Sequence, residues 1–175
     1  TIHSFPTRRS SDLLAETPEH CRQLHLPSPI LREDELEAIA ALDENGIRSK
    51  EIDITYAKDA SLQDAVDRIR KDAVRAIEEG YELLILSDRR MGPERIAVDS
   101  LLATGAIHHY LVREGLREHV GLVLETGQPC AVHHFCTLIG YGAAAVCPYL
   151  AYDSMRGLIA EGVIEGEIEE FVETY

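Results

Sequence analysis

The sequence has few basic residues and no long hydrophobic run. It contains 17 lysines and arginines against 31 aspartates and glutamates, which gives a formal net charge of −14 at pH 7. A surface of this charge repels phosphate groups, which argues against nucleic acid or an anionic membrane as a partner. No apolar run approaches the roughly 20 residues that a membrane-spanning helix needs, and no hydrophobic core of a signal peptide is present.

Cysteine is also scarce and irregularly placed. The four cysteines stand at positions 21, 130, 136 and 147, without the spacing of a disulfide framework. Three of them lie in apolar sequence, where a reduced cysteine behaves as a small hydrophobe. We therefore expect free thiols and a cytoplasmic protein. The length of 175 residues is enough for one domain with a hydrophobic core.

The first thirteen residues, TIHSFPTRRSSDL, differ from the rest because they are basic, rich in serine and without periodicity. Residues 3–13 resemble a translated reading frame of a widely used sequencing-adapter oligonucleotide. We expect residues 1–13 to be a non-native or disordered leader, followed by one domain over 14–175 that comes from a truncated reading frame. An ordinary disordered N-terminus is the alternative, and both interpretations predict no packed structure before about Leu14.

Helical and strand patterns alternate through the remainder of the chain. Apolar residues at helical spacing predict helices over 33–42, 62–79, 98–114, 128–140 and 152–162, with a further exposed helix in the acidic tail over 165–175. Short apolar runs predict strands over 50–56, 81–88, 119–127 and 143–148. This alternation is typical of an α/β fold with a mainly parallel sheet and right-handed crossovers. A doubly wound sheet and part of a βα barrel both satisfy it.

The pattern also makes local predictions. Ser61 is expected to cap the helix that follows it, and residues 89–95 are expected to form a loop. In the helix over 98–114, the expected buried stripe consists of Leu101, Leu102, Gly105 and Val112.

Potential zinc ligands crowd into seven positions, namely Cys130, His133, His134 and Cys136. On a helix, two adjacent histidines point about 100° apart, so they do not easily share one ion. A structural zinc site needs four ligands, and no second Cys-x-x-Cys motif supplies the missing ones. We therefore interpret these residues as packed cysteines with capping or interface histidines, and we predict no metal site.

Two further motifs invite a functional interpretation. Gly140-Tyr141-Gly142 follows a predicted helix and precedes a predicted strand, whereas a phosphate-binding turn has the opposite order. We interpret it as a helix C-cap with close helix–sheet packing. His108 and His109 are adjacent in a predicted helix, and we expect one to face the core and donate a hydrogen bond while the other reaches solvent.

Polar residues follow two of the predicted strands. Ser87, Asp88 and Arg89 end one strand, and Glu125 with Thr126 ends the next. Because α/β folds place ligands at the carboxyl ends of parallel strands, Asp88, Arg89 and Glu125 are the best candidates for a polar site. The alternative, which we favour, is a set of ion pairs that ties loops together.

Several long segments carry a family resemblance. They are "LPSPIL", "DAVRAIEEGYELLILSDR", "SLLATGAIHHYLVREGLREHVGLVLETG" and "HHFCTLIGYGAAAVCPYLAY". In this order they closely resemble the central domain of the large subunit of glutamate synthase, over essentially Leu14 to Tyr175. The resemblance implies a fold like a rudimentary, incomplete TIM-like barrel.

The resemblance also implies a parent enzyme that makes glutamate from glutamine and 2-oxoglutarate. In that family an amidotransferase domain releases ammonia, and an FMN barrel with an iron–sulfur cluster reduces the iminoglutarate formed. A small subunit or ferredoxin is the implied electron-transfer partner. The N-terminal nucleophile, the cluster cysteines and the FMN barrel are not in this sequence, so we assign no catalytic, cofactor or metal residue to any numbered position.

Two hypotheses follow. The first is a scaffold domain, inert alone and free of cofactor, that holds the ammonia-releasing and reducing domains at a fixed distance. It predicts exposed apolar faces where neighbouring domains would pack. The second is a small stand-alone α/β enzyme or ligand-binding module with Asp88, Arg89 and Glu125 around a strand-end pocket.

Overall fold

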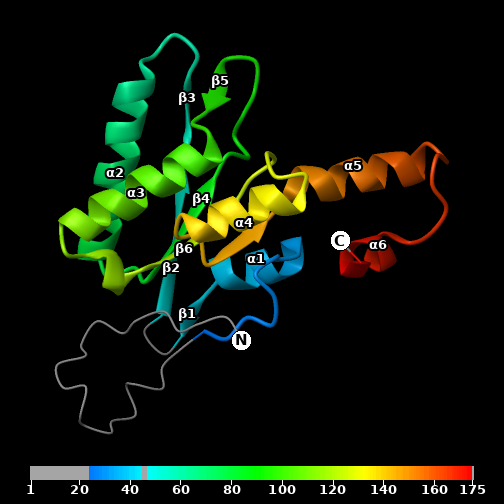
Figure 1. Cartoon of the computed structure of the whole chain (residues 1–175), viewed down its shortest axis with the longest axis horizontal. Helices are drawn as coiled ribbons and strands as arrows, with labels where there is room; N and C mark the ends of the chain where they lie inside the picture. The colour runs from blue at the N-terminus through cyan, green and yellow to red at the C-terminus, as the bar shows by residue number, and fades with distance from the viewer. Residues whose placement is uncertain (1–23, 45–46, 175) are drawn as a thin grey trace, which may run out of the picture.

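A computed structural model describes residues 24–44 and 47–174, and Figure 1 shows how their elements are arranged. The helices are α1 (Glu33–Ala40), α2 (Leu62–Glu78), α3 (Ser100–Arg113), η2 (a 3-10 turn, Arg117–His119), α4 (Val132–Gly140), α5 (Tyr149–Ala160) and α6 (Ile168–Thr174). The strands are β1 (Asp43–Glu44), β2 (Ile47–Asp53), β3 (Thr55–Ala57), β4 (Leu83–Ser87), β5 (Arg95–Ala97), β6 (Gly121–Glu125) and β7 (Ala145–Cys147). The expected leader over 1–13 lies outside the described residues.

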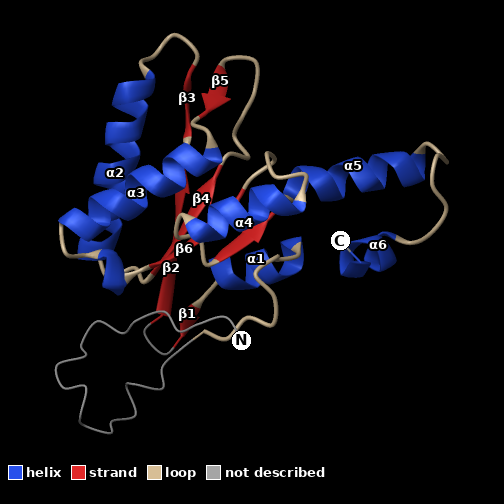
Figure 2. Cartoon of the chain, in the orientation of Figure 1, coloured by secondary structure: helices blue, strands red, loops and turns tan. Residues whose placement is uncertain are grey.

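Five strands form one sheet in the order β1-β2-β4-β6-β7. Strands β2, β4, β6 and β7 run parallel, and the short β1 pairs antiparallel with β2 at one edge (Figure 2). In this register Leu84 lies beside Leu122, and Ser87 beside Glu125, so the carboxyl ends of β4 and β6 meet. The predicted α/β alternation with a mainly parallel sheet is confirmed, and within the described residues the sheet is open rather than a closed barrel.

The two faces of the sheet carry separate hydrophobic cores, because successive side chains of a strand point to opposite faces. On one face, Leu86 and Leu124 pack with α2, α3 and α4. On the other face, Ile85 and Val123 pack with α1 and with Tyr152 of α5. The three crossover helices, α2, α3 and α4, therefore share one face, as they do in part of a βα barrel. A doubly wound sheet would place crossover helices on both faces.

Helix ends follow the sequence signals in most places. Gly80 and Gly115 have φ of 93° and 68° directly after α2 and α3, a conformation that favours glycine. Asp99 caps α3 by accepting hydrogen bonds from two backbone amides. Ser61 occupies the N-cap position of α2, as predicted, but its side chain makes no capping hydrogen bond. Asp64 in the first turn instead supplies negative charge near the helix N-terminus.

The expected buried stripe of α3 is half right, because Gly105 is buried and Leu101 packs partly against the core. Leu102 and Val112 are 43% and 51% exposed, whereas Ala103, Ile107 and Leu111 are fully buried. These three residues recur every four positions and form the row that faces the sheet.

A second, two-stranded sheet was not predicted. The expected strand over 50–56 divides after Asp53, and its second half becomes β3. β3 pairs antiparallel with β5, which begins where the expected loop over 89–95 ends. Figure 1 shows this pair standing beyond the end of the main sheet. Arg95 stabilises the junction through hydrogen bonds to Asp53 and Thr55.

The last two helices form an arm. α5 extends past the sheet, and the chain then returns so that α6 lies against it (Figure 1). The acidic tail is helical, as predicted, but it is not wholly exposed, because Val172 packs against the core on the α1 face.

Candidate functional site

The carboxyl ends of β4 and β6 meet at one edge of the sheet, and there Asp88 is completely buried. Its carboxylate accepts hydrogen bonds from the Thr126 hydroxyl at 2.6 Å and from the Gly127 amide at 3.2 Å. The Tyr149 hydroxyl, at the start of α5, donates a third. We call Asp88, Thr126, Gly127 and Tyr149 the buried cluster. A buried carboxylate with three donors is a satisfied structural group.

Gly127 packs tightly against Tyr149 and Leu150. A Cβ atom at position 127 would lie 3.2 Å from the Tyr149 hydroxyl and 3.1 Å from Cβ of Leu150. Burial and the hydrogen bond to Asp88 together raise the pKa of the Tyr149 hydroxyl above its ordinary value. The hydroxyl therefore stays protonated and remains a donor at neutral pH.

Arg89, the next residue after Asp88, contacts a different set of side chains, all of them carboxylates in ion pairs. Its guanidinium lies 2.9 Å from Glu125, 2.5 Å from Glu33 and 3.7 Å from Asp153. Arg156 of α5 pairs with both Glu33 and Asp153. We call Glu33, Arg89, Glu125, Asp153 and Arg156 the ion-pair network. It connects α1, the ends of β4 and β6, and α5, which are far apart in the sequence.

The ion-pair network is partly exposed and mutually satisfied. The Arg89 side chain is 42% exposed, and its guanidinium also lies 4.4 Å from the centre of the Tyr149 ring. Burial opposes its charge, but the carboxylates of Glu33 and Glu125 raise the pKa of Arg89 above its ordinary value. Glu125 also accepts a 2.6 Å hydrogen bond from Ser87. The network therefore consists of ion pairs that tie together the segments after β4 and β6, which is the alternative favoured from the sequence.

Cys147 ends β7 beneath this network and is fully buried. Burial, with added repulsion from the Glu125 and Glu33 carboxylates, raises the pKa of the Cys147 thiol to about 12. A fully buried thiol with a raised pKa has little thiolate at neutral pH and is a poor nucleophile. Cys147 is therefore a packing residue.

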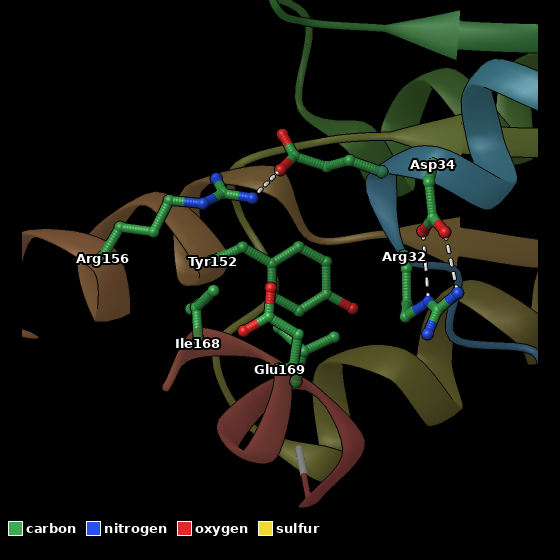
Figure 3. Close-up of a pocket in the computed structure, with 8 residues that line it drawn as sticks. Arg32, Asp34, Tyr152, Arg156, Ile168 and Glu169 are labelled. Carbon is green, nitrogen blue, oxygen red and sulfur yellow. Dashed lines mark hydrogen bonds and ion pairs between the residues drawn. The ribbon is translucent and has the colours of Figure 1, made fainter. Parts of the chain in front are cut away.

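A cavity of about 230 Å³ lies beside the ion-pair network, between α1, α5 and α6 (Figure 3). Figure 3 shows Tyr152 across its floor, with Arg156 on one side and Arg32 and Asp34 on the other. Several polar groups around it have partners within the chain, since Arg32 pairs with Asp34 at 2.7 Å and Tyr152 donates to the Leu31 carbonyl at 3.0 Å. Asp88, Arg89 and Glu125 do not line this cavity.

The chemistry available at this edge is therefore limited. A phosphate-bearing cofactor needs a cation or backbone amides that are free to bind it. Arg89 and Arg156 are each bound to two or more carboxylates, and the Gly127 amide is bound to Asp88. The residues at the strand ends thus fit a structural junction better than a flavin site.

The structure also places the candidate metal ligands. No group of three or more potential ligands gathers among the described residues. Cys130 and Cys136 are exposed, which corrects the expectation that they are packed, and Cys130 precedes α4 rather than lying on it. Cys130, Cys136 and Cys147 are free thiols, as predicted. Cys21 lies outside the described residues.

Gly142 confirms the C-cap interpretation of its motif. It follows α4 with φ of 110°, and its amide and that of Ala143 bond to carbonyls of the last turn. A Cβ atom there would lie 2.3 Å from Nδ1 of His108, so only glycine allows the contact with α3. Arg117 bridges the two by donating to His108 Nδ1 and to the Gly142 carbonyl, both at 2.9 Å.

This arrangement corrects one prediction about the histidines. His108 is the inward one, but its Nδ1 accepts a hydrogen bond rather than donating one. Burial and the charge of Arg117 lower the pKa of His108, so the ring stays neutral and keeps its acceptor. His109 reaches solvent, as expected.

The strand-end pattern predicted Asp88, Arg89 and Glu125 together with Ser87 and Thr126, but not the partners that reach them from α1 and α5. Asp88 and Arg89 are neighbours in sequence, yet they belong to different clusters. Tyr149 could have been found, because it follows β7 just as Arg89 follows β4. The three other members of the ion-pair network carry no sequence signal; they are Glu33, Asp153 and Arg156.

Comparisons with known proteins agree with this structure. Residues 4–175 match the family model of the glutamate synthase central domain. The chain belongs to this family. It is 42% identical over 166 residues to "Glutamate synthase [NADH]" of Schizosaccharomyces pombe, an alignment that covers 92% of this chain. It is 37% identical over 164 residues to "Glutamate synthase [NADPH] large chain" of Bacillus subtilis, which covers 94% of this chain.

A third relative is "Ferredoxin-dependent glutamate synthase 2" of Synechocystis, 38% identical over 154 residues and 85% of this chain. The chain spans only 8% to 11% of the length of these three proteins. Among the helices of the described residues, none is both long and apolar enough to cross a bilayer.

Proposed function

We propose that this chain is the structural domain of a glutamate synthase that holds the neighbouring catalytic domains in place. The observation that carries the proposal is the ion-pair network. At the edge where α/β folds bind ligands, Arg89 is held by Glu33, Glu125 and Asp153 instead. The same edge joins α1, the sheet and α5 into one unit, which is what a spacer between two domains needs.

Exposed apolar residues support the same role. Leu102 and Val112 of α3 and Tyr141 after α4 are each more than 40% exposed. Leu102 and Tyr141 line one groove with Gly105. Exposed patches of this kind mark surfaces that other proteins or domains cover. We propose that a neighbouring domain of the parent chain packs there.

The activity of the parent protein belongs to the proposal. Its reaction would form L-glutamate from L-glutamine and 2-oxoglutarate, with FMN and an iron–sulfur cluster in a separate barrel and ammonia from an amidotransferase domain. The small subunit or ferredoxin would supply electrons. The relatives named above include NADH, NADPH and ferredoxin-dependent proteins.

We further propose the domain boundaries and location. Residues 1–13 are a non-native or disordered leader and residues 14–175 the domain. The three free thiols among the described residues support a cytoplasmic protein. The stand-alone enzyme or ligand-binding module is not favoured. Asp88 is bound by Thr126, and Arg89 is bound by Glu33 and Glu125, so these residues do not surround an open pocket.

Titration of FMN into the purified chain tests the proposal. We expect no change in flavin fluorescence and no yellow protein after gel filtration, and no ammonia release when the chain is incubated with glutamine. Stoichiometric retention of FMN or glutamine hydrolysis would overturn the scaffold role.

A further inference from the structure

Cys130 and His134 form a side-chain pair that the scaffold role does not use. Cys130 lies in the segment between β6 and α4, and His134 lies in the first turn of α4. The sulfur of Cys130 is 3.7 Å from Nδ1 of His134, within hydrogen-bond distance for sulfur. Both side chains are exposed.

The hydrogen bonds define the role of the ring nitrogen. The backbone N–H of Cys130 also points at Nδ1 of His134, at 3.2 Å. Because an N–H group can only donate, Nδ1 must carry the lone pair and the ring proton must sit on Nε2. The Cys130 thiol therefore faces an unprotonated nitrogen, whose lone pair it shares with the Cys130 backbone N–H.

The segment that carries Cys130 is anchored on both sides. The side-chain oxygen of Gln128 accepts two 2.8 Å hydrogen bonds from Ser100, at the start of α3. Downstream, the Thr137 hydroxyl donates to the His134 carbonyl at 2.8 Å. Cys130 stands one residue before Ala131, the N-cap of α4, and the N-terminus of a helix carries partial positive charge.

We propose that Cys130 is the reactive thiol of this chain, and that it takes up low-molecular-weight disulfides with His134 as its base. In the reaction, the proton of the thiol passes to Nδ1 of His134. The sulfur attacks one sulfur of the disulfide, the original S–S bond breaks, and the second sulfur leaves as a thiolate that takes the proton from His134. The product is a mixed disulfide at Cys130, and a reducing thiol reverses it.

The other thiols of the described residues serve as internal comparisons. Cys136 is exposed on α4, but among the described residues its thiol has no histidine partner. Cys147 is fully buried. We therefore expect the order of reactivity to be Cys130, then Cys136, then Cys147. This order follows from the local geometry and does not depend on what the parent enzyme does.

Brief alkylation with iodoacetamide at pH 7, followed by mass spectrometry of the separate peptides, tests the proposal. We expect Cys130 to react at least about fivefold faster than Cys136, and Cys147 to remain unmodified in the folded protein. The comparison is made within one sample and needs no variant. Equal rates at Cys130 and Cys136 would overturn the proposal.

Two variants of exposed histidines show whether the alkylation rate of Cys130 depends on His134 as a base or only on the position of Cys130 near the start of α4. His134→Asn should lower the Cys130 rate to within about twofold of the Cys136 rate. His133→Asn is the matched control and should leave the Cys130 rate unchanged, because the contact to sulfur comes from His134. A thermal melt confirms that both variants fold. An unchanged Cys130 rate in His134→Asn would refute the role of His134.

Glutathione disulfide is the probe for the mixed disulfide. Incubation with the intact chain should add one glutathione at Cys130, and dithiothreitol should remove it. Absence of an adduct, or equal adducts at Cys130 and Cys136, would show that Cys130 is not a selective site for disulfides.

Discussion

Asp88 and Arg89 are neighbours in the sequence, yet their surroundings are opposite. Asp88 is completely buried and bound by neutral donors, whereas Arg89 is 42% exposed and bound by three carboxylates. The buried cluster is shielded from water and salt, so losing one member leaves donors unsatisfied. The ion-pair network is hydrated and screened, and its charges can rearrange. Strand-end position alone therefore does not tell how much a residue contributes to stability.

The largest effect we expect concerns the buried thiol beneath the network. The pKa of Cys147 is about 12 in the folded chain against 9.0 for an ordinary thiol, so the folded state retains the proton more strongly. The stability from this group is fully present below pH 9 and is lost as the pH rises toward 12. This loss should approach about 4 kcal/mol above pH 12, and roughly 3 kcal/mol of it should be present at pH 11. Urea unfolding at pH 8, 9, 10 and 11 measures it.

Cys147→Ala is the control for that measurement. The variant has no thiol to deprotonate at position 147. Its free energy of unfolding should therefore fall less steeply above pH 9 than that of the unmodified chain. Identical slopes would mean that Cys147 is more accessible to water than its burial indicates.

The second prediction concerns the buried cluster itself. Asp88→Ala would leave the Thr126 hydroxyl, the Gly127 amide and the Tyr149 hydroxyl without their acceptor. We expect a loss of about 3 kcal/mol in the free energy of unfolding, measured by urea denaturation. Asp153→Ala, which removes an exposed carboxylate of the ion-pair network, is the matched comparison and should cost less than about 1 kcal/mol. Similar losses of unfolding free energy in the two variants would show that the buried cluster and the ion-pair network do not differ in their contribution to stability.

The smallest effect is expected in the ion-pair network. Arg89→Gln should cost about 1 kcal/mol or less, because Glu33 keeps Arg156 and Glu125 keeps Ser87 as partners. The difference from the unmodified chain should shrink further in 0.5 M sodium chloride. If Arg89→Gln instead lost as much unfolding free energy as Asp88→Ala, independently of salt, the ion pairs of Arg89 would not be screened by solvent as we expect.

Much of the fold could be predicted because strands and helices carry regular hydrophobic patterns. The apolar runs at β4 and β6 and the glycines after α2 and α3 define the alternation directly. The buried face of α3 was predicted only by half, because Leu102 and Val112 are as hydrophobic as Ile107, and only packing decides which of them meets the sheet. The β3–β5 pair was missed because its strands have three residues each, too few for a visible period.

The candidate site was predicted only in part for a similar reason. Position at a strand end identified Asp88, Arg89 and Glu125. Their division into two clusters depends on Tyr149, Glu33 and Asp153, which reach the same edge from α5 and α1. Contacts between residues more than 50 positions apart leave no pattern in a single sequence. The buried, donor-rich surroundings of Asp88 could be seen only in the structure.

The most direct test of the scaffold role uses a complete glutamate synthase that carries this domain, with free ammonia measured per glutamine hydrolysed. If the domain keeps the catalytic domains in register, Asp88→Ala should raise the free ammonia while flavin content stays unchanged, and Arg89→Gln should remain near the unmodified enzyme. Loss of bound flavin in Asp88→Ala, with no additional free ammonia, would contradict the account and point to a cofactor pocket at this edge.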